Sequence, residues 1–187
     1  TQLINSGPRI LEGYPASLAR RAERAAERRG IEIHCGRRVA SAEIDHVDLQ
    51  DGESWPYDVL LWLTGAVSHP LFRDSGLPTD GRGFVDTRST LLVVGQDALF
   101  AVGDCATLID FPETPKAGVY AVRQGPVLTH NLRASVAGQP LQGYRPQSDF
   151  LTLLNLGDGS ALGCKRSLSF QGRWVMRLKD WIDRRFM

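Results

Sequence analysis

A glycine and an acid end one apolar run of this chain, and a lysine opens a helical segment further along. Residues 98–102 are apolar and lead into Gly103 and Asp104. Lys116 begins the helical segment over 116–137, in which apolar side chains recur at helical spacing. A glycine lets a ligand approach the backbone, a carboxylate accepts hydrogen bonds from sugar hydroxyls, and the first N–H groups of a helix attract polar or anionic groups. The pattern predicts a site for a polar ligand that carries sugar hydroxyls.

Three residues of this region have a second, purely structural interpretation. Asp104 could cap the turn that follows it, as aspartate often does. Lys116 could be an exposed lysine, although a cation at a helix N-terminus is unfavourable unless a polar or anionic ligand compensates it. Cys105 could act as a nucleophile, or it could be an inert, packed thiol.

Alternating strands and helices must position these residues. In the first third of the chain, a helix over Pro15–Arg29 ends at Gly30, and Asp51-Gly52 predicts a hairpin turn. The strands expected around them are Gln2–Asn5, Ile31–His34, Val39–Asp45, Val47–Gln50 and Val59–Thr64. A strand, a helix, a strand, a small antiparallel excursion and a return strand are typical of the second half of a nucleotide-binding α/β domain.

The rest of the chain continues this order and then changes to a different kind of unit. After a loop over 67–83, short strands are expected at 84–86, 90–94 and 99–102, and Pro126 should kink or split the helix over 116–137. The tail should form a hairpin around Gly157-Asp158-Gly159 and an amphipathic helix over Arg173–Phe186. Its strands would be Phe150–Leu156 and Ser160–Phe170, and its apolar helix face Trp174, Leu178, Trp181 and Ile182.

Composition limits the classes of function. The 187 residues are 42% hydrophobic and 23% charged, with a net charge of +1, so no electrostatic argument favours nucleic acid as a partner. Cys35, Cys105 and Cys164 lie far apart, which excludes a local redox dithiol or zinc knuckle, and we expect no metal site. No signal peptide and no run of ~20 apolar residues is present, so a cytoplasmic protein is expected.

Two motifs carry a family resemblance. Leu99–Ala106 resembles the second flavin-contacting motif of the pyridine nucleotide-disulfide oxidoreductase superfamily, whose members contain two dinucleotide-binding domains. Tyr57–Ala66 resembles the strand that leads from the NAD domain of these proteins back to the FAD domain, with Leu63 where alanine is usual. The resemblance implies an FAD-dependent NAD(P)H oxidoreductase that passes a hydride from nicotinamide to flavin and electrons to a small-molecule acceptor.

The resemblance also assigns roles to residues. It implies that Asp104 binds the ribitol of FAD and that Lys116 stabilises negative charge at the pyrimidine edge of the flavin. It makes Cys105 an inert neighbour of the cofactor rather than a redox cysteine. The remaining cofactor contacts that it implies are Thr64 and Gly65 at the domain crossing, Gly103 and Ala106 beside the carboxylate, and the backbone of Ala117 and Gly118. Asn5 stands where an acid usually binds the NAD ribose, which leaves NADH or NADPH open.

The chain contains no G-x-G-x-x-G fingerprint and starts in a strand without methionine, so we expect it to be the C-terminal part of a longer flavoprotein. The expected fold class is α/β, with the C-terminal halves of two Rossmann-like domains and a small α+β tail. The expected divisions are 1–66 in the NAD(P) domain, 67–138 in the FAD domain and 139–187 as a docking or dimerisation unit. The chain alone should neither hold FAD tightly nor turn over NADH, because it lacks both pyrophosphate sites and its own N-terminal half.

Shorter motifs resemble particular branches of this superfamily. Residues 115–125 and 156–159 are similar to the type II NADH dehydrogenase branch, which reduces quinones, but Val119 and Arg123 stand where that branch has two glutamines, and only Gln124 is kept. Residues 179–187 are similar to the end of a domain fused ahead of selenide, water dikinase (selenophosphate synthetase). Two alternatives stay open: a non-enzymatic docking or dimerisation module of such a selenium-metabolism fusion, or a quinone reductase at the inner membrane face. A homo-oligomer is expected in each case.

Overall fold

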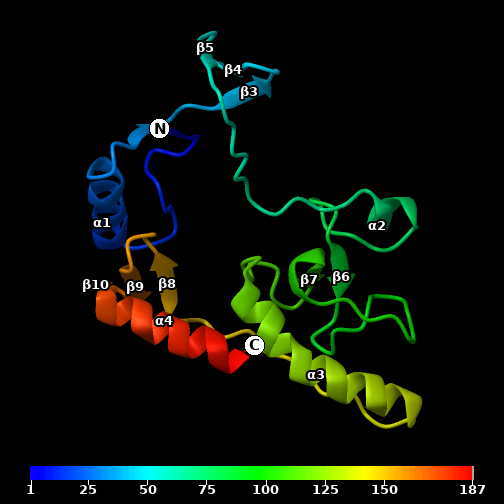
Figure 1. Ribbon diagram of the computed structural model, residues 1–187. Helices are drawn as coiled ribbons and strands as arrows, with labels where there is room; N and C mark the ends of the chain where they lie inside the picture. The colour runs from blue at the N-terminus through cyan, green and yellow to red at the C-terminus, as the bar shows by residue number, and fades with distance from the viewer. Residues whose placement is uncertain (187) are drawn as a thin grey trace. The chain divides into compact units, whose positions relative to one another are not determined.

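Residues 1–186, which the computed structural model describes, fold as two units (Figure 1). The first unit combines residues 1–62 with the tail from residue 149, and the second consists of residues 63–148. The tail therefore packs with the start of the chain. The division at 66 and 138 by cofactor domain stays a prediction.

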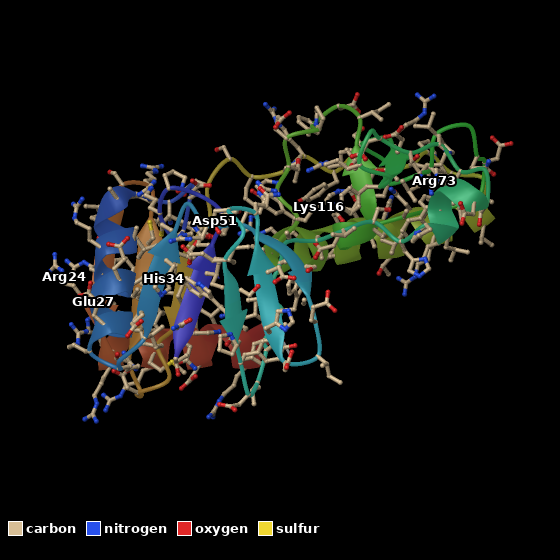
Figure 2. The ribbon with its side chains drawn as sticks, turned by 90° about the horizontal axis from the view of Figure 1, so that it is seen from above. Arg24, Glu27, His34, Asp51, Arg73 and Lys116 are labelled. Atoms are coloured by element: carbon tan, nitrogen blue, oxygen red, sulfur yellow. The ribbon has the colours of Figure 1, made fainter. Side chains whose placement is uncertain are left out.

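The first unit begins with a parallel β-α-β arrangement. Strand β1 (Gln2–Asn5) pairs with β2 (Glu32–Cys35), and helix α1 (Ala16–Glu27) connects them. The helix is rich in alanine and arginine, which favour helix formation. It buries Leu18, Ala19 and Ala25, while Arg24 and Glu27 point outward (Figure 2). Gly30, with φ +66, follows the helix as expected, so these elements confirm the prediction.

An antiparallel sheet of three strands follows. Strands β3 (Val39–Ala42), β4 (His46–Leu49) and β5 (Ser54–Pro56) are paired in sequence order. The predicted turn at Asp51-Gly52 joins the last two of them, with φ +90 at Gly52. Strand β5 is an addition to the predicted elements, and Trp55 on it faces Val47 across the ladder.

The tail forms a second antiparallel sheet. Strands β8 (Thr152–Asn155) and β9 (Ala161–Lys165) make the predicted hairpin, and β10 (Leu168–Gly172) pairs with β9. The prediction of one strand over 160–170 is therefore wrong, because the chain reverses at Arg166, whose φ is +54.

Helix α4 (Arg173–Phe186) has the predicted bounds but a different buried face. It packs against all three strands of the tail sheet. Val175 is fully buried, whereas Trp174 and Trp181 are 55% and 60% exposed. The buried side of the helix is therefore about one residue away from the predicted tryptophan face.

The second unit contains few regular elements. They are α2 (Leu71–Asp74), β6 (Val85–Thr87), the 3-10 turn η1 (Gly103–Cys105), β7 (Ala106–Leu108) and α3 (Gly118–Val136). Strands β6 and β7 are parallel, with Val85 opposite Ala106. The core of the unit is built around Leu91, Leu108 and Tyr144.

The strands predicted at 59–64, 90–94 and 99–102 are wrong. Residues 59–64 form no strand, and Val59, Leu61 and Leu63 are more than 70% exposed because no strand among the described residues pairs with them. Residues 90–94 and 99–102 make only isolated bridges. Pro126 lies inside α3 without splitting it, so one of its two predicted effects is excluded, and the kink stays a prediction. The carbonyl of Val122, which lacks its helical donor because of the proline, belongs to a half-exposed residue where water can satisfy it.

Candidate functional site

The turn at Gly103 is hydrogen-bonded to α3. Its φ of +70 is a left-handed conformation that favours glycine, and a Cβ built there would lie 3.2 Å from the Cβ of Ala121. The Gly103 N–H donates to Oε1 of Gln124 at 2.6 Å, and Gln124 is 5% exposed. A buried side chain of the helix thus fixes the backbone that carries the next residue, Asp104.

Asp104 is exposed, and its carboxylate makes no hydrogen bond to any residue within 1–186. Helix α3 begins close by in the same unit, since it packs against η1. Its N-cap, Ala117, offers no side-chain hydrogen bond to the first N–H groups of the helix. The site therefore presents a free carboxylate and free backbone donors, which suit a ligand that has both hydroxyl and acceptor groups.

Lys116, which Figure 2 labels, is half-buried. Its Nζ donates to the carbonyl of Ala106 and, at 2.9 Å, to Oγ1 of Thr107. It also lies 4.3 Å from the centre of the Phe84 ring, close enough for a cation–π contact. Burial, followed by the positive charge of Arg82, lowers the pKa of Lys116 from its ordinary value.

Two carboxyl groups of the same unit have pKa values that are shifted in opposite directions. Burial alone would raise the pKa of Asp80, but hydrogen bonds from the Thr107 hydroxyl and the N–H groups of Arg82 and Phe84 together hold it below the ordinary value. Burial, and then the negative charge of Asp80, raise the pKa of Asp86.

Two cavities adjoin Lys116. A narrow cleft of about 10 Å³ has room for roughly one water molecule and is lined by Gly103, Asp104, Ala106 and Lys116, among others. A wider groove of about 410 Å³ lies beside it. Its wall includes Asp80, Arg82, Thr107, Glu113 and Lys116.

The structure thus brings together most of the expected site residues in one unit. Ala117 and Gly118 lie at the start of α3, as predicted. The Cys105 Sγ donates to the carbonyl of Val102 at 3.2 Å, so this half-buried thiol is engaged within its own turn. Thr64 and Gly65 are exposed in the irregular segment and line neither cavity, so the structure does not bring them to the site.

Sequence reasoning missed Asp80 and Thr107, and it read Gln124 only as a residue kept from a motif. Asp80 is followed by a glycine, which predicts a turn, but nothing in that pattern indicates a contact with a residue far along the chain. Within residues 1–186, no group of three His, Cys, Asp or Glu side chains is placed to hold a metal ion. No helix of that part of the chain is long and apolar enough to cross a membrane.

A sequence model described as pyridine nucleotide-disulphide oxidoreductase matches residues 1–125. The demethylphylloquinone reductase NdbB of Synechocystis sp. is 30% identical over 174 residues, which cover 89% of this chain and 43% of that protein. The type II NADH:quinone oxidoreductase of Staphylococcus saprophyticus is 25% identical, covering 97% of this chain and 46% of its own length. The chain therefore spans about half the length of these curated relatives.

Solved structures share the fold. The structure of NDH2 from Plasmodium falciparum in complex with NADH superposes with a TM-score of 0.72 at 10% identity, covering 97% of this chain and 53% of that one. The expected α/β class with Rossmann-type halves is confirmed by this likeness.

Proposed function

The chain belongs to the pyridine nucleotide-disulphide oxidoreductase family, and from this premise we propose that it supplies part of the flavin site of an FAD-dependent NAD(P)H oxidoreductase. Bound FAD would accept a hydride from nicotinamide and pass its electrons to an acceptor. The observation that carries the proposal is the free carboxylate of Asp104, which follows a left-handed glycine clamped by Gln124.

The residues of the chain would bind and orient the cofactor. Asp104 would accept hydrogen bonds from the ribitol hydroxyls, since its oxygens make none within the described chain. The backbone N–H groups at Ala117 and Gly118 would donate to the pyrimidine edge of the ring. Lys116 would place a positive charge near the same edge, where it stabilises negative charge on the reduced ring. Thr64 and Gly65 would lie at the domain crossing, and Gly103, Cys105 and Ala106 along the ribitol.

The experiment compares Asp104→Ala with Asp97→Ala in the complete protein. Asp97 is an exposed aspartate of the same unit and lines neither cavity. Removing a charge-assisted hydrogen bond costs about 1.5–3 kcal/mol, so FAD should bind roughly 10–100-fold more weakly to Asp104→Ala. Flavin absorbance after gel filtration and a titration of the apoprotein with FAD measure this, and Asp97→Ala should match the parent. Unchanged flavin together with lost self-association would favour the docking-module alternative instead.

A quinone is the acceptor class that the relatives favour, because the proteins matched over most of this chain are named as quinone reductases. Steady-state reduction of a soluble quinone by NADH and by NADPH in the complete protein tests both the acceptor and the nucleotide. A protein that reduces ferricyanide but no quinone would contradict this part of the proposal. The selenium-metabolism partner and the homo-oligomer stay predictions.

The exposed tryptophans of α4 favour a second part of the proposal, a position at the membrane surface. Trp174 and Trp181 are more than half exposed, the Arg185 guanidinium lies 5.7 Å from the centre of the Trp181 ring, and the same helix carries further basic side chains. Co-sedimentation with anionic liposomes should fall for Trp174→Ala/Trp181→Ala relative to the parent. Equal sedimentation of both proteins would contradict a membrane role for this helix.

A further inference from the structure

The hydroxyl of Thr107 lies between a carboxylate and an ammonium group. Thr107 is 5% exposed; its Oγ1 donates to Oδ2 of Asp80 at 2.8 Å and accepts from Nζ of Lys116 at 2.9 Å. A threonine hydroxyl has one proton. Once that proton points at Asp80, only lone pairs of the oxygen face Lys116, and this arrangement suits a lysine that donates.

The carboxylate of Asp80 is itself fixed in orientation. Its Oδ1 accepts the backbone N–H groups of Arg82 at 2.8 Å and Phe84 at 3.1 Å. Its Oδ2 is thereby directed to Thr107. A rotation of the carboxylate would break all three hydrogen bonds, so the direction of the threonine proton is determined by the turn that carries Asp80.

The other surroundings of Lys116 act on its charge in both directions. Burial disfavours the charged form, and so does Arg82, whose guanidinium lies 5.3 Å from the centre of the Phe84 ring. The negative charge of Asp80 favours it, as does that of Asp104 on η1. The amine also donates a hydrogen bond to the carbonyl of Ala106 and lies over the face of the Phe84 ring.

We propose that Asp80 and Thr107 are positioning residues for Lys116. The carboxylate orients the threonine hydroxyl, and the hydroxyl holds Lys116 as a charged, immobile donor at the wall of the 410 Å³ groove. The inference rests on the proposed role of Lys116 beside the flavin. A cation already held in place stabilises charge that develops on the ring without reorganisation during the reaction.

The substitution Asp80→Asn tests the direction of the hydrogen bonds while it conserves shape. The two backbone N–H groups keep the amide oxygen on their side, so the amide nitrogen must face Thr107. The threonine oxygen then accepts from asparagine, and its proton becomes available to a neutral amine of Lys116. The variant should therefore favour neutral Lys116, both through this reversal and through the loss of a negative charge.

The experiment measures the pH dependence of amine labelling in the 187-residue chain by competitive acetylation and mass spectrometry. Lys165 and Lys179 are the other lysines and provide internal references. In Asp80→Asn and in Thr107→Val, the labelling midpoint of Lys116 should move to lower pH, with about tenfold faster labelling below the midpoint of the parent. Thr107→Ser should restore the parent profile, and Glu113→Gln, which removes a carboxylate from the same groove, should leave it unchanged.

Circular dichroism of each variant establishes that it is folded, and the isosteric Asp80→Asn remains informative if Thr107→Val does not fold. Midpoints equal to the parent in Asp80→Asn would overturn the proposal. A shift in Glu113→Gln as large as that in Asp80→Asn would also overturn it, because a general field effect would then replace the oriented hydroxyl. The labelling needs no flavin. A complete protein that binds no FAD would therefore refute the proposed function without changing this result.

Discussion

Replacing Gly103 by alanine tests how the turn beside Asp104 is built. The φ of +70 costs alanine about 1–2 kcal/mol. The new Cβ would lie 3.2 Å from the Cβ of Ala121, a tight contact that adds about 1 kcal/mol. Alanine also restricts the unfolded chain, which returns about 0.4–1 kcal/mol. The free energy of unfolding should therefore fall by about 2 kcal/mol.

A double-mutant cycle separates the two causes. Ala121→Gly costs about 1 kcal/mol by itself, because glycine weakens a helix. It also removes the atom that the new Cβ would meet, so Gly103→Ala should cost about 1 kcal/mol less in this background. Gly81→Ala is the matched control, since Gly81 is in the same unit, has no left-handed φ and leaves its Cβ in open space.

Urea unfolding followed by far-ultraviolet circular dichroism measures the free energies, and hydrogen exchange of peptides from residues 103–124 reads the second unit directly. Tryptophan fluorescence reports the first unit, because Trp55, Trp62, Trp174 and Trp181 all belong to it. Equal costs in the two backgrounds would refute the contact with Ala121. A cost below about 0.5 kcal/mol would refute the requirement for a left-handed residue.

Three further predictions concern buried or half-buried groups. Asn131→Asp should lower the free energy of unfolding, measured by urea titration, by about 3–5 kcal/mol. The amide nitrogen of Asn131 donates to two backbone carbonyls, and the substitution places a carboxylate oxygen against them at a buried position. A loss under about 1 kcal/mol would contradict this reasoning. Gly163→Ala should cost about 1–3 kcal/mol by tryptophan fluorescence, since its Cβ would fall 1.9 Å from the Phe170 ring, and Phe170→Leu should relieve most of that cost. Asp86→Asn should stabilise the protein at neutral pH, because the raised folded pKa of Asp86 means that its charge opposes folding there. That gain should vanish as the pH falls through the folded pKa and below the unfolded value of about 4, and a gain that persists in acid would contradict the assignment to charge.

The elements that sequence predicts best are those determined by neighbouring residues. The alanine-rich helix α1, its glycine end and the hairpin at Asp51-Gly52 all follow from local propensity and turn chemistry. The hairpin before β9 follows in the same way from two glycines with positive φ, Gly157 and Gly159. Each of these elements needs only contacts within a few residues, so no knowledge of the tertiary structure is required.

The segment 59–64 shows why a strong strand pattern is not sufficient. A continuous apolar run is typical of a strand buried on both faces of a sheet. A strand exists only when another chain segment satisfies its backbone groups, and no described segment pairs with residues 59–64. The helix α4 differs for a related reason, because the choice between Val175 and the tryptophans as the buried side depends on the shape of the tail sheet.

In the candidate site, too, some residues could be predicted from the local sequence and others depend on the tertiary structure. Asp104 and Lys116 could be proposed from the sequence, because the residue type and its immediate neighbours are enough to suggest a role. Asp104 is a carboxylate directly after a glycine, and Lys116 is a lysine just before a helix. Asp80 could not be proposed in this way, because its contact with Thr107 spans 27 residues and depends on the parallel pairing of β6 with β7. Lys116 is fixed to two successive residues of β7, through the carbonyl of one and the side chain of the next, whereas Asp104 stays exposed. The chain therefore organises the cation in advance, whereas Asp104 stays available to the cofactor that we propose for it. Substitutions in β7 should change the charge of Lys116 more than they change the affinity for that proposed cofactor.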